Sequence, residues 1–314
     1  MTMFMRTLRS LGSGTIELSH FPFYRECLRG LILPLLMSAS LCLPSFGNDT
    51  SFQISQQKVA EIPLKACRGY LIVVEGRIGD LGDQNFLLDT GSNPSMIDRR
   101  VIEKLGVQGS PRQLSVFNSS IASERVTLPE LQFGPVERRN LPIMVADFSP
   151  ISRQLGTRID AVIGLDVLGG ANFSVDYARR RITFAALAEP HTAPFVAGPQ
   201  FIIVNLQNGP RLFHLLVDTG ATELVLFREH LRAADYQWTN ATGTGHNVSG
   251  SFRLGLIVLT RARIGSRDIG PQPALVTASR KEIGGELDGL LGLSCLRPKS
   301  ISFDFEHGLI GWSD

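Results

Sequence analysis

Two short segments of this sequence carry an aspartate in nearly identical surroundings. Residues 87–92 read LLDTGS and residues 216–221 read LVDTGA, which places Asp89 and Asp218 at matching positions 129 residues apart. Two carboxyl groups held side by side cannot both ionise easily, so such a pair keeps one proton between them. One carboxylate then takes a proton from water while the other carboxyl gives one to the substrate. The two segments therefore predict an acid–base site made of Asp89 and Asp218.

The residues that follow each aspartate have their own physical tasks. Thr90 and Thr219 carry hydroxyls that can hydrogen-bond across a two-fold interface to the opposite loop. Gly91 and Gly220 allow a tight turn, which brings backbone N–H groups close to the carboxylate. These four residues are predicted to support the two loops.

The next position differs between the two segments, with Ser92 in the first and Ala221 in the second. A hydroxyl at this position can hydrogen-bond the neighbouring carboxylate and favour its ionisation. We therefore expect Asp89 and Asp218 to be inequivalent. An Ala221→Ser change is then expected to shift the acidic limb of the pH–rate profile.

The similarity between the two halves extends beyond the aspartate segments. Residues 160–165 (DAVIGL) resemble residues 288–293 (DGLLGL), and residues 174–177 (SVDY) resemble residues 302–305 (SFDF). These blocks follow in the same order at an offset of 128, against 129 for the aspartates. A constant offset over three blocks indicates that one module is duplicated within the chain.

Each half begins with a pattern typical of a β-hairpin. Aliphatic runs at 71–75 and 85–88 flank a Gly-containing turn, and runs at 201–205 and 212–217 flank Asn208-Gly209-Pro210. Further turns are expected at Gly134 and Gly265. The sequence therefore predicts a mainly β fold with few short helices.

Short helices are expected after each aspartate loop, near residues 99–105 and 227–234. Asp166 and Ser294 occupy matching positions after the second repeat block. Both residue types accept hydrogen bonds from the free amides that begin a helix. We interpret them as helix N-caps.

The N-terminal segment is typical of an export signal. Arg25 and Arg29 precede an apolar stretch at 30–43, which is short for a membrane-spanning helix, and small residues follow it. We predict a signal peptide at 1–47 and a leader at 48–66; an uncleaved membrane anchor is the alternative. Without residues 1–47 the acidic and basic residues are equal in number, which gives no reason to expect nucleic-acid binding or stable membrane insertion.

The remaining chain divides into two lobes of similar size, 67–187 and 200–314. A proline-containing stretch at 188–199 is predicted to be an exposed linker between them. Cys67 and Cys295 remain after signal removal, and an exported protein can join them in a disulfide, although the sequence does not show that they are close.

The duplicated DTGS and DTGA loops, each followed 74 or 75 residues later by an apolar-apolar-Gly strand, resemble the aspartic proteases. The short lobes and Ala221 are closer to retropepsins and bacterial retropepsin-like proteins than to pepsin. The resemblance covers most of residues 67–314. It implies two closed-barrel-like lobes with a central cleft and a flap, for which 116–122 and 243–251 are the candidates.

The resemblance also implies an activity. Asp89 and Asp218 would be catalytic, hydrolysing peptide bonds of a peptide or protein substrate, with neither metal nor organic cofactor. Both copies lie in one chain, so a monomer would suffice. The protein is expected to be exported, either periplasmic or secreted. The alternative is a non-catalytic periplasmic module that binds a peptide or ligand, or serves as a scaffold, on the same fold.

Overall fold

The computed structural model describes residues 7–8, 59–65, 69–116, 119–197, 201–247, 250–278 and 287–314. Apart from β1 (Thr7–Leu8), which pairs with strand β16 (Gln237–Asn247), the expected signal peptide lies outside these residues, and export stays a prediction. None of the helices in the described residues is both long and apolar enough to cross a membrane.

The first lobe is a seven-stranded sheet in the order β3-β4-β9-β5-β8-β7-β6. An additional pairing of β3 with β7 closes six of these strands into a barrel. The strands are β3 (Ile72–Ile78), β4 (Leu81–Leu88), β5 (Met96–Asp98), β6 (Ser110–Val116), β7 (Ser119–Phe133), β8 (Val136–Ala146) and β9 (Ala161–Ile163). The helices are α1 (Arg99–Leu105), α2 (Ser149–Leu155) and α3 (Leu165–Leu168).

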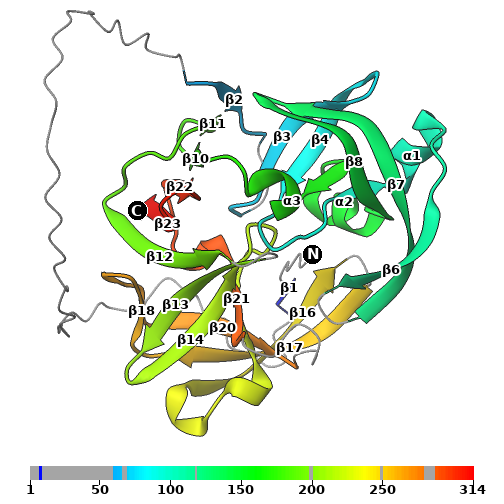
Figure 1. Cartoon of the computed structure of the whole chain (residues 1–314). Coiled ribbons are helices and arrows are strands. Elements are labelled where there is room, and N and C mark those ends of the chain that lie inside the picture. Colours follow the sequence, from blue (N-terminus) through cyan, green and yellow to red (C-terminus); the bar gives the residue numbers. More distant parts are fainter. Residues whose placement is uncertain are drawn as a thin grey trace, which may run out of the picture.

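The second lobe repeats this arrangement (Figure 1). Its strands follow the order β16-β17-β20-β15-β21-β14-β13, which matches the first lobe strand for strand. They are β13 (Ile202–Asn208), β14 (Arg211–Val217), β15 (Leu224–Phe227), β16 (Gln237–Asn247), β17 (Gly250–Leu259), β20 (Gln272–Thr277) and β21 (Gly289–Leu291). Two further strands lie off this order: β18 (Ala262–Ile264), which pairs with β13, and β19 (Arg267–Asp268), which pairs with β18. Three 3₁₀ turns complete it: η1 (Arg228–His230), η2 (Ala233–Asp235) and η3 (Leu293–Cys295).

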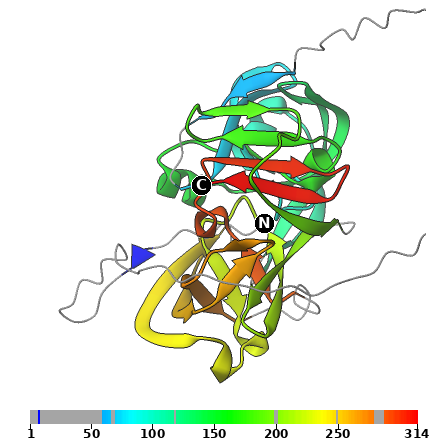
Figure 2. The ribbon, with the colours of Figure 1, turned by 90° about the vertical axis from the view of Figure 1, so that its left-hand side faces the viewer.

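A six-stranded antiparallel sheet, in the order β2-β11-β10-β22-β23-β12, joins the two halves. Its strands are β2 (Glu61–Pro63), β10 (Phe173–Asp176), β11 (Arg181–Thr183), β12 (His191–Ala197), β22 (Ser300–Asp304) and β23 (Leu309–Ser313). Figure 2 shows the C-terminal strands beside the green strands of the first half. Ser174 pairs with its repeat counterpart Ser302, and their hydroxyl oxygens are 3.0 Å apart. The two-fold axis of the duplication therefore passes between these residues.

The expected exposed linker at 188–199 is wrong, because most of it forms β12. This strand pairs with β23 on one side and with β13 on the other. Ala193 and Phe195 alternate with exposed residues and point into the core. Pro194 lies within this strand, since a proline fits a strand wherever its missing N–H is not needed for pairing.

The two expected helices have different outcomes. Helix α1 forms where predicted, because the Asp98 side chain accepts a hydrogen bond from the Arg100 N–H (2.9 Å) and Gly106 ends the helix in the left-handed conformation. At the position that matches Asp98 the second lobe has Phe227, which offers no such acceptor. The 3₁₀ turns η1 and η2 replace the predicted helix there.

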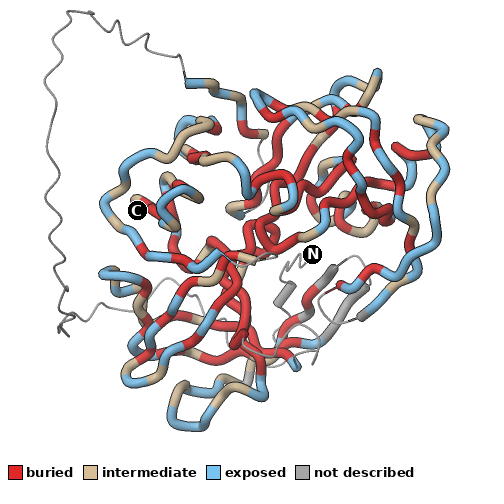
Figure 3. The backbone as a smooth tube through the Cα atoms, viewed as in Figure 1, coloured by how far each residue is buried: buried red, intermediate tan, exposed pale blue. Residues whose placement is uncertain are grey.

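The buried side chains connect the lobes. One cluster of buried apolar residues extends through both lobes and the joining sheet, while two smaller clusters belong to one lobe each. Figure 3 shows buried backbone inside each lobe and in the region between them. The two predicted hairpins form, and so do the turns predicted at Gly134 and Gly265. Both glycines have a positive φ, so these sequence predictions are confirmed.

Candidate active site

Each aspartate lies directly after the second strand of its hairpin. Asp89 follows β4, which pairs parallel with β9, and Asp218 follows β14, which pairs parallel with β21. The Asp89 N–H donates to the Ile163 carbonyl (2.9 Å), and the Asp218 N–H donates to the Leu291 carbonyl (3.1 Å). The second repeat block therefore fixes the backbone of both aspartates.

The glycine in that block is required by close packing. A Cβ on Gly164 would lie 2.2 Å from the Ser92 carbonyl oxygen, and a Cβ on Gly292 would lie 2.5 Å from the Glu223 carbonyl oxygen. Both distances are far below a van der Waals contact. A side chain at either glycine would therefore push the aspartate loop out of place.

The fold brings Asp89 and Asp218 together, and both are fully buried. Oδ1 of Asp89 accepts a hydrogen bond from the Gly91 N–H, and Oδ1 of Asp218 accepts one from the Gly220 N–H, each at 2.9 Å. Within the described residues no N–H or O–H donor reaches either Oδ2 atom. One oxygen of each carboxyl group is thus fixed, and the other is left for water or substrate.

Gly91 and Gly220 touch the carboxyl group of the opposite loop. A Cβ on Gly91 would lie 2.4 Å from Cγ of Asp218, and a Cβ on Gly220 would lie 2.5 Å from Cγ of Asp89. Neither glycine has a positive φ. Glycine is needed here for the close approach of the two loops, rather than for an unusual backbone conformation.

The two threonines form reciprocal hydrogen bonds between the lobes, as predicted. The Thr90 hydroxyl donates to the Val217 carbonyl (2.7 Å) and accepts from the Thr219 N–H (3.2 Å). The Thr219 hydroxyl donates to the Leu88 carbonyl (2.8 Å) and accepts from the Thr90 N–H (3.0 Å). These four buried bonds hold the loops in a symmetric arrangement.

The family comparison agrees with this geometry. A sequence model of the family described as Aspartyl protease matches residues 74–167 and again residues 203–295. The chain belongs to the aspartyl protease family. The two matches place one copy in each lobe, which supports a bilobed, retropepsin-like aspartyl protease. A search of curated proteins found no match.

Both carboxyl groups of this aspartyl protease have raised pKa values. Burial raises the pKa of Asp89, although the hydrogen bond from the Gly91 N–H opposes the rise. Burial also raises the pKa of Asp218, and the neighbouring Asp89 raises it further, well above its ordinary value. The pair therefore titrates as one unit.

The expected hydrogen bond from Ser92 to its neighbouring carboxylate is wrong. The Ser92 hydroxyl donates to the Pro94 carbonyl instead (3.1 Å). Ala221, at the matching position, is buried among apolar side chains of the second lobe. The Ser92 hydroxyl therefore does not distinguish Asp89 from Asp218 through a direct hydrogen bond.

Asp166 and Ser294 are not helix N-caps, since Gly164 and Gly292 occupy those positions. Both Asp166 oxygens accept from the Ser95 N–H (3.0 Å each), and Oδ1 also accepts from the Ser95 hydroxyl (2.6 Å). The Ser294 hydroxyl donates to the Glu223 carboxylate (3.2 Å). We call these two pairs the loop clamps, because each ties the repeat block to its aspartate loop. Ser95 and Glu223 lie outside any matching motif, so no sequence pattern points to them.

Both flap candidates are hairpins. Residues 116–122 lie where β6 turns into β7, and residues 243–251 lie where β16 turns into β17. The hairpin tips, 117–118 and 248–249, lie outside the described residues, so the choice of flap stays open.

Cys295 is a free, buried thiol, and burial raises its pKa. Cys67 lies outside the described residues. Within the described residues, no three His, Cys, Asp or Glu side chains form a group suited to a metal ion.

Proposed function

We propose that this aspartyl protease hydrolyses peptide bonds with a water activated by Asp89 and Asp218. The observation that carries the proposal is the pairing of two buried carboxyl groups, each with Oδ1 fixed by a glycine N–H and Oδ2 free of donors within the described residues. Two such groups in contact hold one proton between them, which supplies a base and an acid at one place.

The two roles belong to the pair. Burial raises the pKa of both carboxyl groups, so one of them starts protonated while its partner starts ionised. The ionised carboxylate accepts a proton from water as the water oxygen attacks the scissile carbonyl carbon. The protonated carboxyl group gives its proton to the carbonyl oxygen, which produces a neutral tetrahedral intermediate.

The second half of the reaction restores the dyad. The carboxyl group that received a proton from water gives it to the amide nitrogen, and its partner takes one from a hydroxyl of the intermediate. The C–N bond breaks, releasing an acid and an amine. No covalent bond forms between substrate and protein, and the dyad again holds one proton. Since one chain supplies both aspartates, a monomer is sufficient for this site.

The proposal requires a bell-shaped dependence of kcat/KM on pH, because activity needs one proton on the pair. Rate is lost at high pH when the shared proton leaves, and at low pH when the second carboxyl group is protonated.

The test is cleavage of a mixed peptide library by the full chain, from acidic to neutral pH, beside the Asp89→Asn and Asp218→Asn variants. Mass spectrometry identifies the products, and circular dichroism checks that all three proteins are folded. We expect cleavage by the wild type and a loss of about 10³-fold or more in each variant. No cleavage by folded wild type at any pH would contradict the proposal and favour a binding module.

A further inference from the structure

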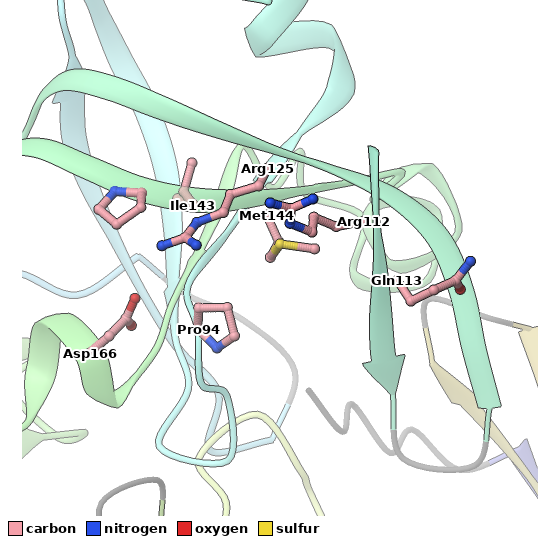
Figure 4. Close-up of a pocket in the computed structure, with 8 residues that line it drawn as sticks. Pro94, Arg112, Gln113, Arg125, Ile143, Met144 and Asp166 are labelled. Carbon is pink, nitrogen blue, oxygen red and sulfur yellow. The ribbon is translucent and has the colours of Figure 1, made fainter. Parts of the chain in front are cut away.

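The first lobe contains a pocket of about 390 Å³ between the β6–β7 hairpin and the segment that follows the Asp89 loop. Figure 4 shows the side chains of Arg112 and Arg125 extending from the hairpin beside Met144, with Pro94 and Asp166 on the opposite side. Ile143 and Met144 on β8, both buried, supply apolar surface. The pocket thus combines an apolar wall with two guanidinium groups.

Neither guanidinium group is paired with a carboxylate in the described part of the chain. The Arg112 guanidinium donates a hydrogen bond to the Pro111 carbonyl (3.0 Å). Glu124, the acidic residue adjacent to Arg125, is in an ion pair with Arg99 (2.9 Å). Among the described residues no carboxylate forms an ion pair with Arg112 or Arg125, so two positive charges face the pocket.

The carboxylate of the pocket, Asp166, is already engaged. Its two oxygens accept the Ser95 N–H and hydroxyl bonds of the loop clamp. Asp166 therefore has less capacity to accept a hydrogen bond from a further donor. An additional anion in the pocket would be bound mainly by Arg112 and Arg125, since guanidinium groups match the geometry of a carboxylate.

One residue that lines the pocket, Pro94, is close in sequence to Asp89 of the catalytic pair. Pro94 is five residues after Asp89, and a five-residue segment spans at most roughly 17 Å. A bound peptide in an extended conformation covers a similar distance in about five residues. A side chain within about five residues of the scissile bond is thus able to reach the pocket.

We propose that this pocket binds an acidic side chain of the peptide substrate, held by Arg112 and Arg125, and that the protease therefore selects substrates with a Glu or Asp near the cleavage site. This inference rests on the proposed function. The apolar wall contacts the methylene groups of the side chain, and the guanidinium groups contact its carboxylate.

The test begins with one peptide that the wild type cleaves. Variants of it carry Glu or Gln, one at a time, at about five positions on either side of the cleaved bond. We expect kcat/KM to be about tenfold higher for Glu than for Gln at one position, which is the effect of one charge-assisted hydrogen bond at a partly open site. The ratio should fall as ionic strength rises.

Three protein variants locate the preference. Arg112→Gln and Arg125→Gln should each lower the Glu/Gln ratio toward one. The matched control is Arg139→Gln, which removes an exposed arginine of the same lobe that pairs with Glu137 and does not line the pocket. A ratio near one in the wild type at every position would overturn the inference, as would a ratio that survives in both pocket variants.

Failure of the proposed function gives a different result. If folded wild type cleaves neither Glu nor Gln peptides, peptide hydrolysis is wrong. The pocket is then judged by equilibrium binding of acidic and amide peptide pools to the wild type and to Arg125→Gln. Tighter binding of the acidic pool, lost in Arg125→Gln, supports the pocket, and equal binding of the two pools overturns it.

Discussion

The first lobe and the second lobe differ in how continuous their long strands are. Strand β7 runs unbroken over Ser119–Phe133, whereas the same path in the second lobe is divided into β17 and β18. Strand β8 is likewise continuous, and its counterpart is divided into β19 and β20. The order of strands is nevertheless the same in both lobes. Divergence is thus tolerated far from the aspartate loops, while the topology that places them is kept.

The two loop clamps also differ, because the acid and the hydroxyl exchange positions between the lobes. In the first lobe the acid, Asp166, is in the repeat block and the hydroxyl, Ser95, follows the aspartate loop. In the second lobe the hydroxyl, Ser294, is in the repeat block and the acid, Glu223, follows the loop. The clamp needs one donor and one acceptor, and either side can supply either one. The following predictions test how equivalent the two lobes are.

The largest effect is expected from Gly91→Ala and Gly220→Ala. Each added Cβ would lie 2.4 or 2.5 Å from the opposite carboxyl carbon, which displaces the dyad. Each variant should lose about 10²-fold or more in kcat/KM, because a misplacement of about 1 Å has that effect on a catalytic site. Gly82→Ala is the matched control, since a Cβ there meets nothing within 4 Å. A large loss in only one of the two variants would show that the loops are not equivalent.

The threonine bonds give the next effect. Thr90→Val and Thr219→Val each remove a buried hydroxyl that bonds two backbone groups of the opposite loop. Each should lower the free energy of unfolding by about 1–3 kcal/mol in urea denaturation. The Ser variants retain the hydroxyl and serve as controls. A double-mutant cycle should show coupling, and purely additive losses would contradict the reciprocal arrangement.

The loop clamps should show unequal effects on stability. Asp166 receives three hydrogen-bond contacts from Ser95, so Asp166→Ala should lower the free energy of unfolding by about 1–3 kcal/mol. Ser294 makes one bond at 3.2 Å, and Ser294→Ala should cost about 0.5–1 kcal/mol. Chemical denaturation of both variants measures the difference. Equal losses would indicate that the clamps support their loops equally.

Asp218→Asn should change the pH dependence of stability. Since the pKa of Asp218 is raised in the folded protein, the contribution of Asp218 to stability is largest at low pH and is lost as pH rises above the ordinary aspartate value of 3.8. The neutral amide does not titrate. The variant should therefore gain stability over the wild type toward neutral pH, and the gain should vanish in acid. Urea denaturation across this range measures it, and a pH-independent difference would exclude the raised pKa.

The smallest effect is expected from Ser92→Ala, which makes the first loop read like the second. The Ser92 hydroxyl donates to Pro94 and not to Asp89. The acidic limb of the pH–rate profile should stay in place, with a stability loss of about 1 kcal/mol or less. A shifted limb would show that the hydroxyl reaches Asp89 during the reaction.

Local sequence patterns were sufficient for many elements. The hairpins are defined by aliphatic runs and turn residues, and α1 is defined by Asp98 and Gly106, all of which act on nearby residues. The short helix predicted at 227–234 forms only as the two 3₁₀ turns η1 and η2, because Phe227 at the N-cap position offers no side-chain acceptor. The exposed linker was wrong because β12 is stabilised by β23 and β13, which are distant in sequence.

The sequence by itself determined the duplication, the family and the candidate pair Asp89 and Asp218, because these depend on residue type and spacing. Only the tertiary structure decided what each neighbour of the pair does. The glycines contact the opposite carboxyl group, Ser92 bonds Pro94, and Asp166 holds Ser95. The physical reason is that these contacts depend on close approach of segments from different strands and lobes, which spacing along one chain does not encode.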